Sequence, residues 1–192
     1  MGTRNLTIVQ LDGAYKVAQY GQWDGYPDCG GIEALTFARK LVDPAFRSRF
    51  EANLRKCSFL TESEIEELND KILRDKIADW REVYPELSRD TGRRILDLIY
   101  NADNGLRLKN EIDFAADGLF CEWAWLIDLD SNRFEAYKGF ISRSPLGPEH
   151  RFAFLNEKAQ DGYYPIQKVA EWDLSNLPTE LAFLEEFKAV KD

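Results

Sequence analysis

Alternating hydrophobic and polar positions near the start of the chain predict a β-hairpin. Two β-prone runs, residues 6–11 and 14–20, are separated by Asp12-Gly13, a pair suited to the positive φ angles of a two-residue hairpin turn. The segment YGQWDGYP, residues 20–27, then breaks the strand pattern with two glycines and a proline. We therefore expect this segment, called the aromatic loop below, to be a shaped loop at the end of a sheet.

The spacing of apolar residues then becomes helical. Helices are predicted over residues 32–42, over residues 44–57, from residue 61 to just before Pro85, and around residues 95–99, with Asn104-Gly105 as the last stop signal. Thr61 and Glu64 form a capping box at the start of the third helix. Its apolar stripe consists of Ile65, Leu68, Ile72, Ile77 and Trp80.

Strand character returns in the last third of the chain. Residues 120–129 and 133–141 flank Asp130-Ser131-Asn132 and predict a second hairpin. A later strand is expected over residues 163–172, and an amphipathic helix over residues 177–190. The expected fold is α+β: an antiparallel sheet made of the N-terminal hairpin and the C-terminal strands, an inserted block of about four helices, and a C-terminal helix. The length of 192 residues and the lack of a long linker favour a single domain over residues 1–192.

Composition narrows the possible partners. With 25 basic and 34 acidic residues, the net charge of −9 opposes binding to nucleic acid and to anionic membranes. Cys29, Cys57 and Cys121 show neither disulfide nor metal-site spacing, which fits a reducing compartment. The chain has no secretory pattern and no run of about 18 apolar residues. The prediction is a cytoplasmic protein that binds neither nucleic acid nor membrane.

The sequence lacks the residues that several common metal-binding and nucleotide-binding sites require. His150 is the only histidine and lies in a Pro- and Gly-rich loop, where solvent exposure is expected, so histidine-clustered zinc sites are excluded. The phosphate-binding glycine motifs of nucleotide enzymes are absent. The segment DLDSN, residues 128–132, imitates a calcium loop, but Arg133 replaces the required glycine, so a hairpin turn is expected. No metal and no cofactor are predicted, and the sequence leans against an enzyme.

The aromatic loop is the strongest candidate site. Tyr20, Trp23 and Tyr26 would form a cage or stacking platform for a planar or cationic ligand, while Gln22 and Asp24 would bind its polar edge. The alternative is a packed loop whose aromatic side chains plug the end of the sheet. In that alternative, Asp24 pairs with Arg4.

The segment after the loop, Asp28-Cys29-Gly30-Gly31, precedes a predicted helix. Exposed N–H groups at Gly30, together with Arg4, would hold a phosphate or carboxylate, and the same field would lower the pKa of the Cys29 thiol. The alternative is that Asp28 is an ordinary N-cap and that the glycines allow close packing.

Two resemblances bear on function. The motif GTRNL, the hairpin and the aromatic loop resemble an uncharacterised family of bacterial, phage and fungal proteins, with a looser match over residues 128–139. The resemblance implies an intracellular α+β domain without an assigned activity, and in a phage setting the sequestration of a host signal is an expected role. More weakly, Thr3 and Asp24 are similar in placement to the residues of N-terminal nucleophile hydrolases, although Met1 and Gly2 precede Thr3.

The leading hypothesis is a binding protein for a small, partly anionic and nucleotide-like ligand. Its candidate ligand-binding residues are Thr3, Arg4, Tyr20, Gln22, Trp23, Asp24, Tyr26 and Gly30. One alternative is a hydrolase that uses Thr3 or Cys29 as its nucleophile. Another is an interaction protein whose acidic surface blocks a basic partner.

Overall fold

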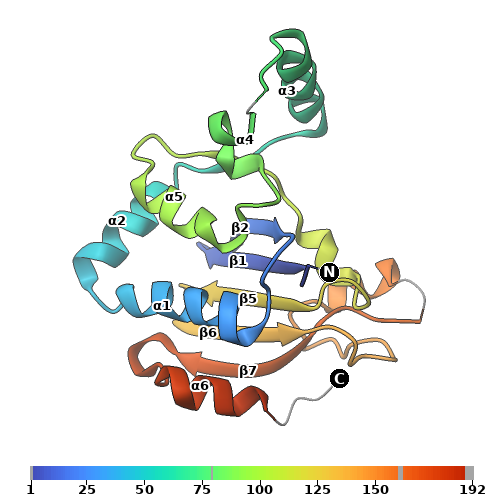
Figure 1. Cartoon of the computed structure of the whole chain (residues 1–192). Helices are drawn as coiled ribbons and strands as arrows, with labels where there is room; N and C mark the ends of the chain where they lie inside the picture. The colour runs from blue at the N-terminus through green and yellow to red at the C-terminus, as the bar shows by residue number, and fades with distance from the viewer. Residues whose placement is uncertain (1, 79, 160–161, 189–192) are drawn as a thin grey trace.

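A mixed β-sheet forms the centre of the protein. The computed structural model describes residues 2–78, 80–159 and 162–188. Within these residues, five strands lie in the order β2-β1-β5-β6-β7 (Figure 1). They are β1 (Asn5–Leu11), β2 (Ala14–Gly21), β5 (Trp123–Asp128), β6 (Arg133–Lys138) and β7 (Gln167–Asp173). The α+β class is confirmed. The sheet is not purely antiparallel, because β1 and β5 run parallel while the other neighbouring strands are antiparallel.

Both predicted hairpins are present. Asp12 and Gly13 have φ angles of 55° and 71°, the left-handed pair that the first turn requires. In the second turn, the Asp128 carboxylate accepts hydrogen bonds from the N–H groups of Asp130 and Ser131 at 3.0 and 2.9 Å. The Asp130 carboxylate in turn accepts from the N–H groups of Asp12 and Gly13 at 2.8 and 2.9 Å, which joins the two hairpin tips.

The helical block lies between β2 and β5. Its α-helices are α1 (Ile32–Lys40), α2 (Pro44–Leu54), α3 (Glu62–Arg74), α4 (Trp80–Val83) and α5 (Ile95–Asn101). The capping box of Thr61 and Glu64 is confirmed. The single long helix predicted up to Pro85 is wrong, because Lys76 has a φ of 49°, in the left-handed region that ends α3. The chain then turns back, and α4 is a separate helical turn.

Short elements connect these parts. A pair of two-residue strands, β3 (Ser58–Phe59) and β4 (Arg107–Leu108), lies outside the main sheet. Near the C-terminus, α6 (Glu180–Phe187) confirms the predicted helix, although Val190 lies outside the described residues. The remaining turns are the π-helical turn η1 (Pro27–Gly31) and the 3₁₀ turns η2 (Pro85–Leu87), η3 (Gly92–Arg94), η4 (Ile112–Ala116), η5 (Ala153–Lys158) and η6 (Leu174–Asn176).

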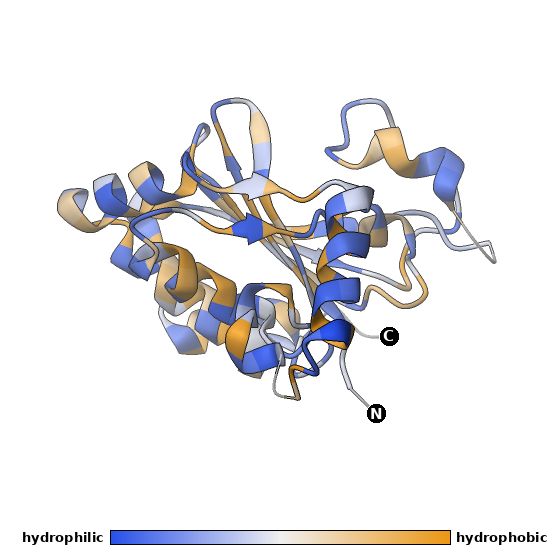
Figure 2. Ribbon diagram, turned by 90° about the horizontal axis from the view of Figure 1, so that it is seen from above, coloured by the Kyte–Doolittle hydropathy of each residue, from blue (hydrophilic) through white to orange (hydrophobic). Residues whose placement is uncertain are grey.

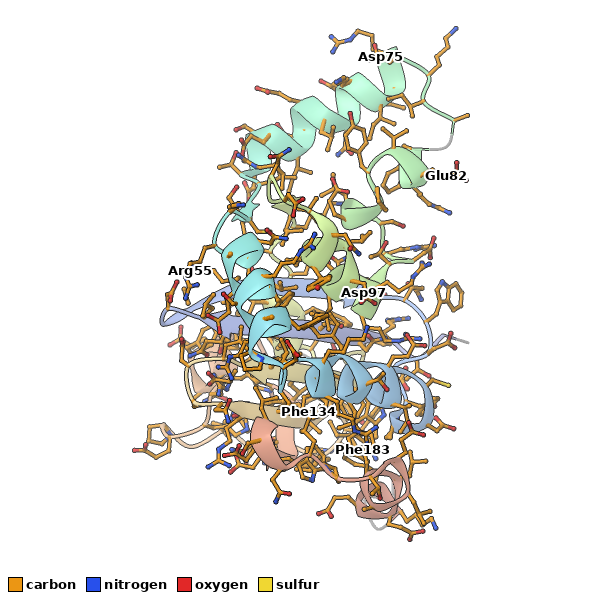
Figure 3. All side chains as sticks on the ribbon, turned by 90° about the vertical axis from the view of Figure 1, so that its left-hand side faces the viewer. Arg55, Asp75, Glu82, Asp97, Phe134 and Phe183 are labelled. Atoms are coloured by element: carbon orange, nitrogen blue, oxygen red, sulfur yellow. The ribbon has the colours of Figure 1, made fainter. Side chains whose placement is uncertain are left out.

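Apolar side chains cover both faces of the sheet. The larger cluster packs the helices against one face, and it includes Phe134 of β6 and Phe183 of α6 (Figure 3). Trp123 and Trp125 are buried there and stack with ring centroids 5.5 Å apart. On the other face, η4 and η5 cover a second cluster. Figure 2 shows hydrophobic and hydrophilic residues alternating along the helices, as expected where a helix has one face on the core.

Helix α3 differs from the helices that pack on the sheet. It stands away from the sheet layers (Figures 1 and 3), and none of its residues is buried. No helix in the described ranges has the length and apolar character needed to cross a membrane.

Candidate functional site

The buried Asn5 side chain holds the aromatic loop in shape. Its amide group lies within hydrogen-bonding distance of the carbonyl oxygens of Thr3, Gly21 and Trp23, at 3.1, 3.3 and 3.1 Å. Because this donor at the start of β1 meets the carbonyls of Gly21 and Trp23, the first half of the loop is fixed to the end of the sheet. A Cβ atom at Gly25 would lie 2.7 Å from that of Asn5, so this close approach requires glycine.

The loop continues directly into a helical turn. The N–H of Gly30 donates to the Asp24 carbonyl at 2.8 Å, and the N–H of Gly31 donates to the Tyr26 carbonyl at 3.1 Å. These donors are satisfied within the chain, so the prediction of exposed N–H groups at Gly30 is wrong. The alternative of Asp28 as an N-cap is also wrong, because the helical turn begins at Pro27 and follows Tyr26. Close packing of the glycines is confirmed: a Cβ at Gly30 would lie 2.6 Å from the Asp24 carbonyl oxygen.

The Cys29 thiol is not activated by this helix start. Its side chain is exposed, but partial desolvation, followed by the carboxylates of Asp28 and Asp24, raises the pKa of the thiol. The predicted lowering of the Cys29 pKa is therefore wrong. A raised pKa leaves less nucleophilic thiolate at neutral pH, which weakens the thiol-hydrolase hypothesis.

Arg4 and Asp24 do not meet. The Arg4 guanidinium lies over the Phe120 ring, 4.5 Å from its centroid, and it forms no ion pair with Asp24 in the described part of the chain. Burial raises the pKa of Tyr20, and the Arg4 cation acts in the opposite direction. The Tyr20 ring packs edge-on against Phe114 of η4, 4.9 Å away. The predicted pairing of Arg4 with Asp24 is wrong, because the sheet places Arg4 and Tyr20 on the side covered by η4.

Three of the predicted residues line a different hollow. Gln22, Trp23 and Asp24 line a cavity of about 200 Å³ between the aromatic loop and residues 88–94, which have the sequence SRDTGRR and are called the basic segment below. The Gln22 N–H donates to the Arg89 carbonyl at 3.0 Å. Trp23 is 48% exposed, and its indole N–H donates to the Asp90 carboxylate at 2.9 Å. The other predicted residues, Thr3, Arg4, Tyr20, Tyr26 and Gly30, are not among those that line this cavity.

The basic segment supplies the positive charge that Arg4 was expected to supply. Arg93 forms a bidentate pair with Glu33, and Arg94 donates to the Asp90 carbonyl at 2.8 Å. The Arg89 guanidinium has neither a hydrogen-bond partner nor an ion pair among the described residues. All three arginines line the cavity. A cluster of three arginines within six residues was visible in the sequence, but nothing local indicated that it packs beside the aromatic loop.

A larger hollow adjoins the first one. It has a volume of about 540 Å³ and shares Asp90, Thr91 and Arg94 with the smaller cavity, while α5 contributes Asp97 and Leu98. The smaller cavity alone falls below the usual volume of about 300–1,000 Å³ for small-molecule sites, and the larger one falls within it. The smaller cavity thus supplies the basic part of the combined hollow, and the larger cavity supplies most of its volume.

Thr3 and Tyr26 lie at the edges of the loop. Thr3 is buried at 5% exposure, and its carbonyl accepts a hydrogen bond from the Gly25 N–H at 3.1 Å. Gly2 is wedged against the Gln22 carbonyl and the Trp23 ring, so a Cβ there would lie within 2.5 Å of both. The absence of a side chain at Gly2 therefore leaves room for the Trp23 ring. Tyr26 is 51% exposed and is not among the residues that line the cavity.

A second polar cluster lies between the sheet and residues 150–151, and sequence reasoning missed it. The Arg151 guanidinium donates to the Asp128 carboxylate at 2.7 Å and to both Glu135 oxygens at 2.8 and 2.9 Å. His150 is half-buried rather than solvent-exposed, and its ring meets Tyr137 edge-on at 6.0 Å. Burial, and next the Lys168 cation, lower the pKa of His150. Arg151 clamps the 150–151 segment to the sheet.

The described residues hold no group of three or more His, Cys, Asp or Glu side chains placed to bind a metal ion. No protein-family model, curated protein or solved structure matches this chain.

Proposed function

We propose that the protein binds a small, partly anionic ligand of nucleotide-like chemistry between the aromatic loop and the basic segment. The observation that carries the proposal is the unpaired Arg89 guanidinium beside a cavity that also contacts the half-exposed Trp23 indole. A guanidinium fork matches the oxygens of a phosphate or carboxylate. An indole face offers stacking area for a planar ring.

Charge at the cavity differs from that of the whole chain. Arg89, Arg93 and Arg94 line it together with Asp24 and Asp90, so the lining is net positive in a protein of net charge −9. Glu33 already neutralises Arg93, and Trp23 and Arg94 bind the carboxylate and the carbonyl of Asp90. Arg89 is therefore the residue expected to bind the anion. The adjoining 540 Å³ cavity would take the rest of the ligand.

Isothermal titration calorimetry with inorganic phosphate, AMP and ATP tests this function. We expect the nucleotides to bind more tightly than phosphate, because only they have a ring to stack on Trp23. Losing a hydrogen bond to a charged group costs about 1.5–3 kcal/mol, so Arg89→Ala should weaken binding about tenfold or more. Trp23→Ala should bring the nucleotide affinity closer to that of phosphate.

Arg143→Ala is the matched control. Arg143 is also exposed and lies over the Tyr163 ring at 3.7 Å, but it lines neither cavity. Its replacement should leave affinity unchanged. If no probe binds, or if Arg89→Ala and Trp23→Ala bind as well as the wild-type protein, the proposal is refuted.

The alternatives have distinct signatures. An N-terminal nucleophile requires Thr3 to carry a free amine, so a mass spectrum of the purified protein with Gly2 still attached would count against it. An acidic blocker of a basic partner would lose that partner at moderate salt.

A further inference from the structure

The buried side chain of Gln19 attaches the basic segment to the strand that leads into the aromatic loop. Gln19 lies on β2 and is 2% exposed. Its amide nitrogen, Nε2, lies 3.2 Å from the carbonyl oxygen of Ser88 and 3.3 Å from that of Tyr20. Ser88 is the first residue of the basic segment and stands 69 positions further along the chain. This hydrogen bond therefore joins the two walls of the smaller cavity.

The surroundings of Gln19 fix the orientation of its amide. Only the NH₂ group of an amide can donate to a carbonyl, so the amide oxygen, Oε1, points away from Ser88 and Tyr20. Oε1 is buried and has no hydrogen-bond partner among the described residues. A buried polar atom without a partner costs stability, so stability alone does not favour glutamine at this position. The contribution specific to glutamine is the hydrogen bond to the Ser88 carbonyl.

The position of Arg89 depends on its backbone. Its guanidinium has neither a hydrogen bond nor an ion pair within the described part of the chain, so no polar contact holds the side chain in place. Its backbone is attached at two successive carbonyls. Gln19 binds the carbonyl of Ser88, and the Gln22 N–H donates to the carbonyl of Arg89 at 3.0 Å. The Ser88 carbonyl also accepts from the Thr91 N–H at 3.1 Å, which closes the turn over residues 88–91.

We propose that Gln19 is a positioning residue for the anion-binding end of the site, because it holds the backbone that carries Arg89 beside Trp23. This role rests on the proposed function, since it concerns the same cavity. Gln19 lines neither the smaller nor the larger cavity, so it acts through the backbone of the basic segment and does not touch the ligand. Its loss weakens the binding of the anionic group and leaves the stacking on Trp23 in place.

Calorimetry of Gln19→Met with inorganic phosphate, AMP and ATP tests this role. Methionine keeps the length of the side chain and removes the donor. A neutral hydrogen bond is worth a factor of about two to ten in an equilibrium constant, so we expect the affinity for all three probes to fall by about that factor. An equal fall for phosphate and for the nucleotides would locate the effect at the anionic group.

Thr7→Val is the matched control. Thr7 lies opposite Gln19 on β1 and is 1% exposed, and its hydroxyl has no hydrogen-bond partner among the described residues. This substitution also removes a buried polar group from the same pair of strands, but Thr7 lines neither cavity. It should leave the affinity unchanged. Thermal unfolding should show both variants folded at the temperature of the titrations.

A double variant separates positioning from a general loss of structure. If Gln19 acts through Arg89, Gln19→Met should cost little further affinity in a chain that already carries Arg89→Ala. A merely structural role would lower the affinity by the same factor in both backgrounds.

Site-resolved amide hydrogen exchange provides a readout that needs no ligand. The N–H groups of Gln22 and Thr91 donate to the two attached carbonyls, so both should exchange faster in Gln19→Met. The N–H of Gly25 donates to the Thr3 carbonyl, away from the basic segment, and should exchange at the wild-type rate.

The two proposals fail in different ways. A wild-type protein that binds none of the probes would overturn the function, and with it the role of Gln19 in binding. Three results would overturn the role of Gln19 alone: wild-type affinity in Gln19→Met, an equal loss in Thr7→Val, or a loss that is the same with and without Arg89. Unchanged exchange at Gln22 in Gln19→Met would overturn that role as well.

Discussion

Removing the Arg151 charge should destabilise the fold strongly. The side chains of Asp128 and Glu135 are 4% and 5% exposed, and Arg151 binds both carboxylates. Arg151→Met keeps most of the apolar stem but leaves two nearly buried carboxylates without their cation. Breaking such a buried pair from one side costs about 3–5 kcal/mol. For a chain of this size, each kcal/mol lowers the melting temperature by about 2–4 °C, so a fall of about 6–20 °C is expected.

The stability lost in Arg151→Met should also depend on pH in a defined direction. Burial alone would raise the pKa of Asp128, but hydrogen bonds from Ser131 and Arg151 outweigh it and hold that pKa below its ordinary value. A depressed pKa contributes stability above the unfolded-state pKa and loses it as pH falls through the folded-state pKa. In the variant, the Asp128 carboxylate loses the hydrogen bond from Arg151 while burial still raises its pKa, so protonation of Asp128 relieves part of the cost. The difference between variant and wild type should therefore be largest at neutral pH and smaller near about pH 4.

Urea unfolding followed by tryptophan fluorescence measures both effects. Arg133→Met is the control, because Arg133 pairs with Asp173 at 3.6 Å between side chains that are each about 40% exposed. It should produce a much smaller change. Two results would refute the stabilising role of Arg151. One is a loss in the free energy of unfolding below about 1 kcal/mol for Arg151→Met, the size typical of exposed pairs. The other is a loss that is equal at both pH values.

Three further predictions concern the aromatic loop and its support. Gly30→Ala should lower the melting temperature, because its Cβ would press against a backbone carbonyl at 2.6 Å, whereas Gly147→Ala, with no atom within 4 Å, should have little effect. Trp125→Phe removes the indole N–H that donates to a loop carbonyl at 3.1 Å, so a loss of at least about 1–3 kcal/mol in urea unfolding is expected. Iodoacetamide should alkylate Cys29 no faster than free cysteine at neutral pH, with a rate that rises with pH, because the pKa of this thiol is raised; faster labelling would contradict that shift.

Local patterns in the sequence predicted most of the elements. Asp12-Gly13 and the Thr61–Glu64 capping box are local motifs, and each determines the backbone conformation of only a few adjacent residues. Both could therefore be predicted without tertiary information. The end of α3 could not be predicted from a local motif in this way. The apolar stripe continues to Trp80 in helical register, but the chain turns back at Lys76, and Trp80 lines the same hollow as Ile65 and Ile72.

The candidate site was located only in part. The aromatic loop lies at the end of the sheet as expected, and Trp23 is accessible. The pairing of Arg4 with Asp24 was predicted wrongly because neighbouring positions in an extended chain point to opposite faces of a sheet. Thr3 and Asn5 therefore contact the loop, while Arg4 lies over Phe120. The basic segment is about 65 residues further along the chain, and only the fold brings it beside Trp23.

The parallel pairing of β1 with β5 has a consequence for folding during synthesis. The contact between Asp12 and Asp130 closes a separation of 118 residues, and β1 is an inner strand of the sheet. On the ribosome, the first hairpin emerges early with one edge of β1 unpaired, and its partner strand follows only after the whole helical block. We therefore expect slow folding that depends on long-range contacts, with a nascent edge that is open to misassociation until β5 arrives.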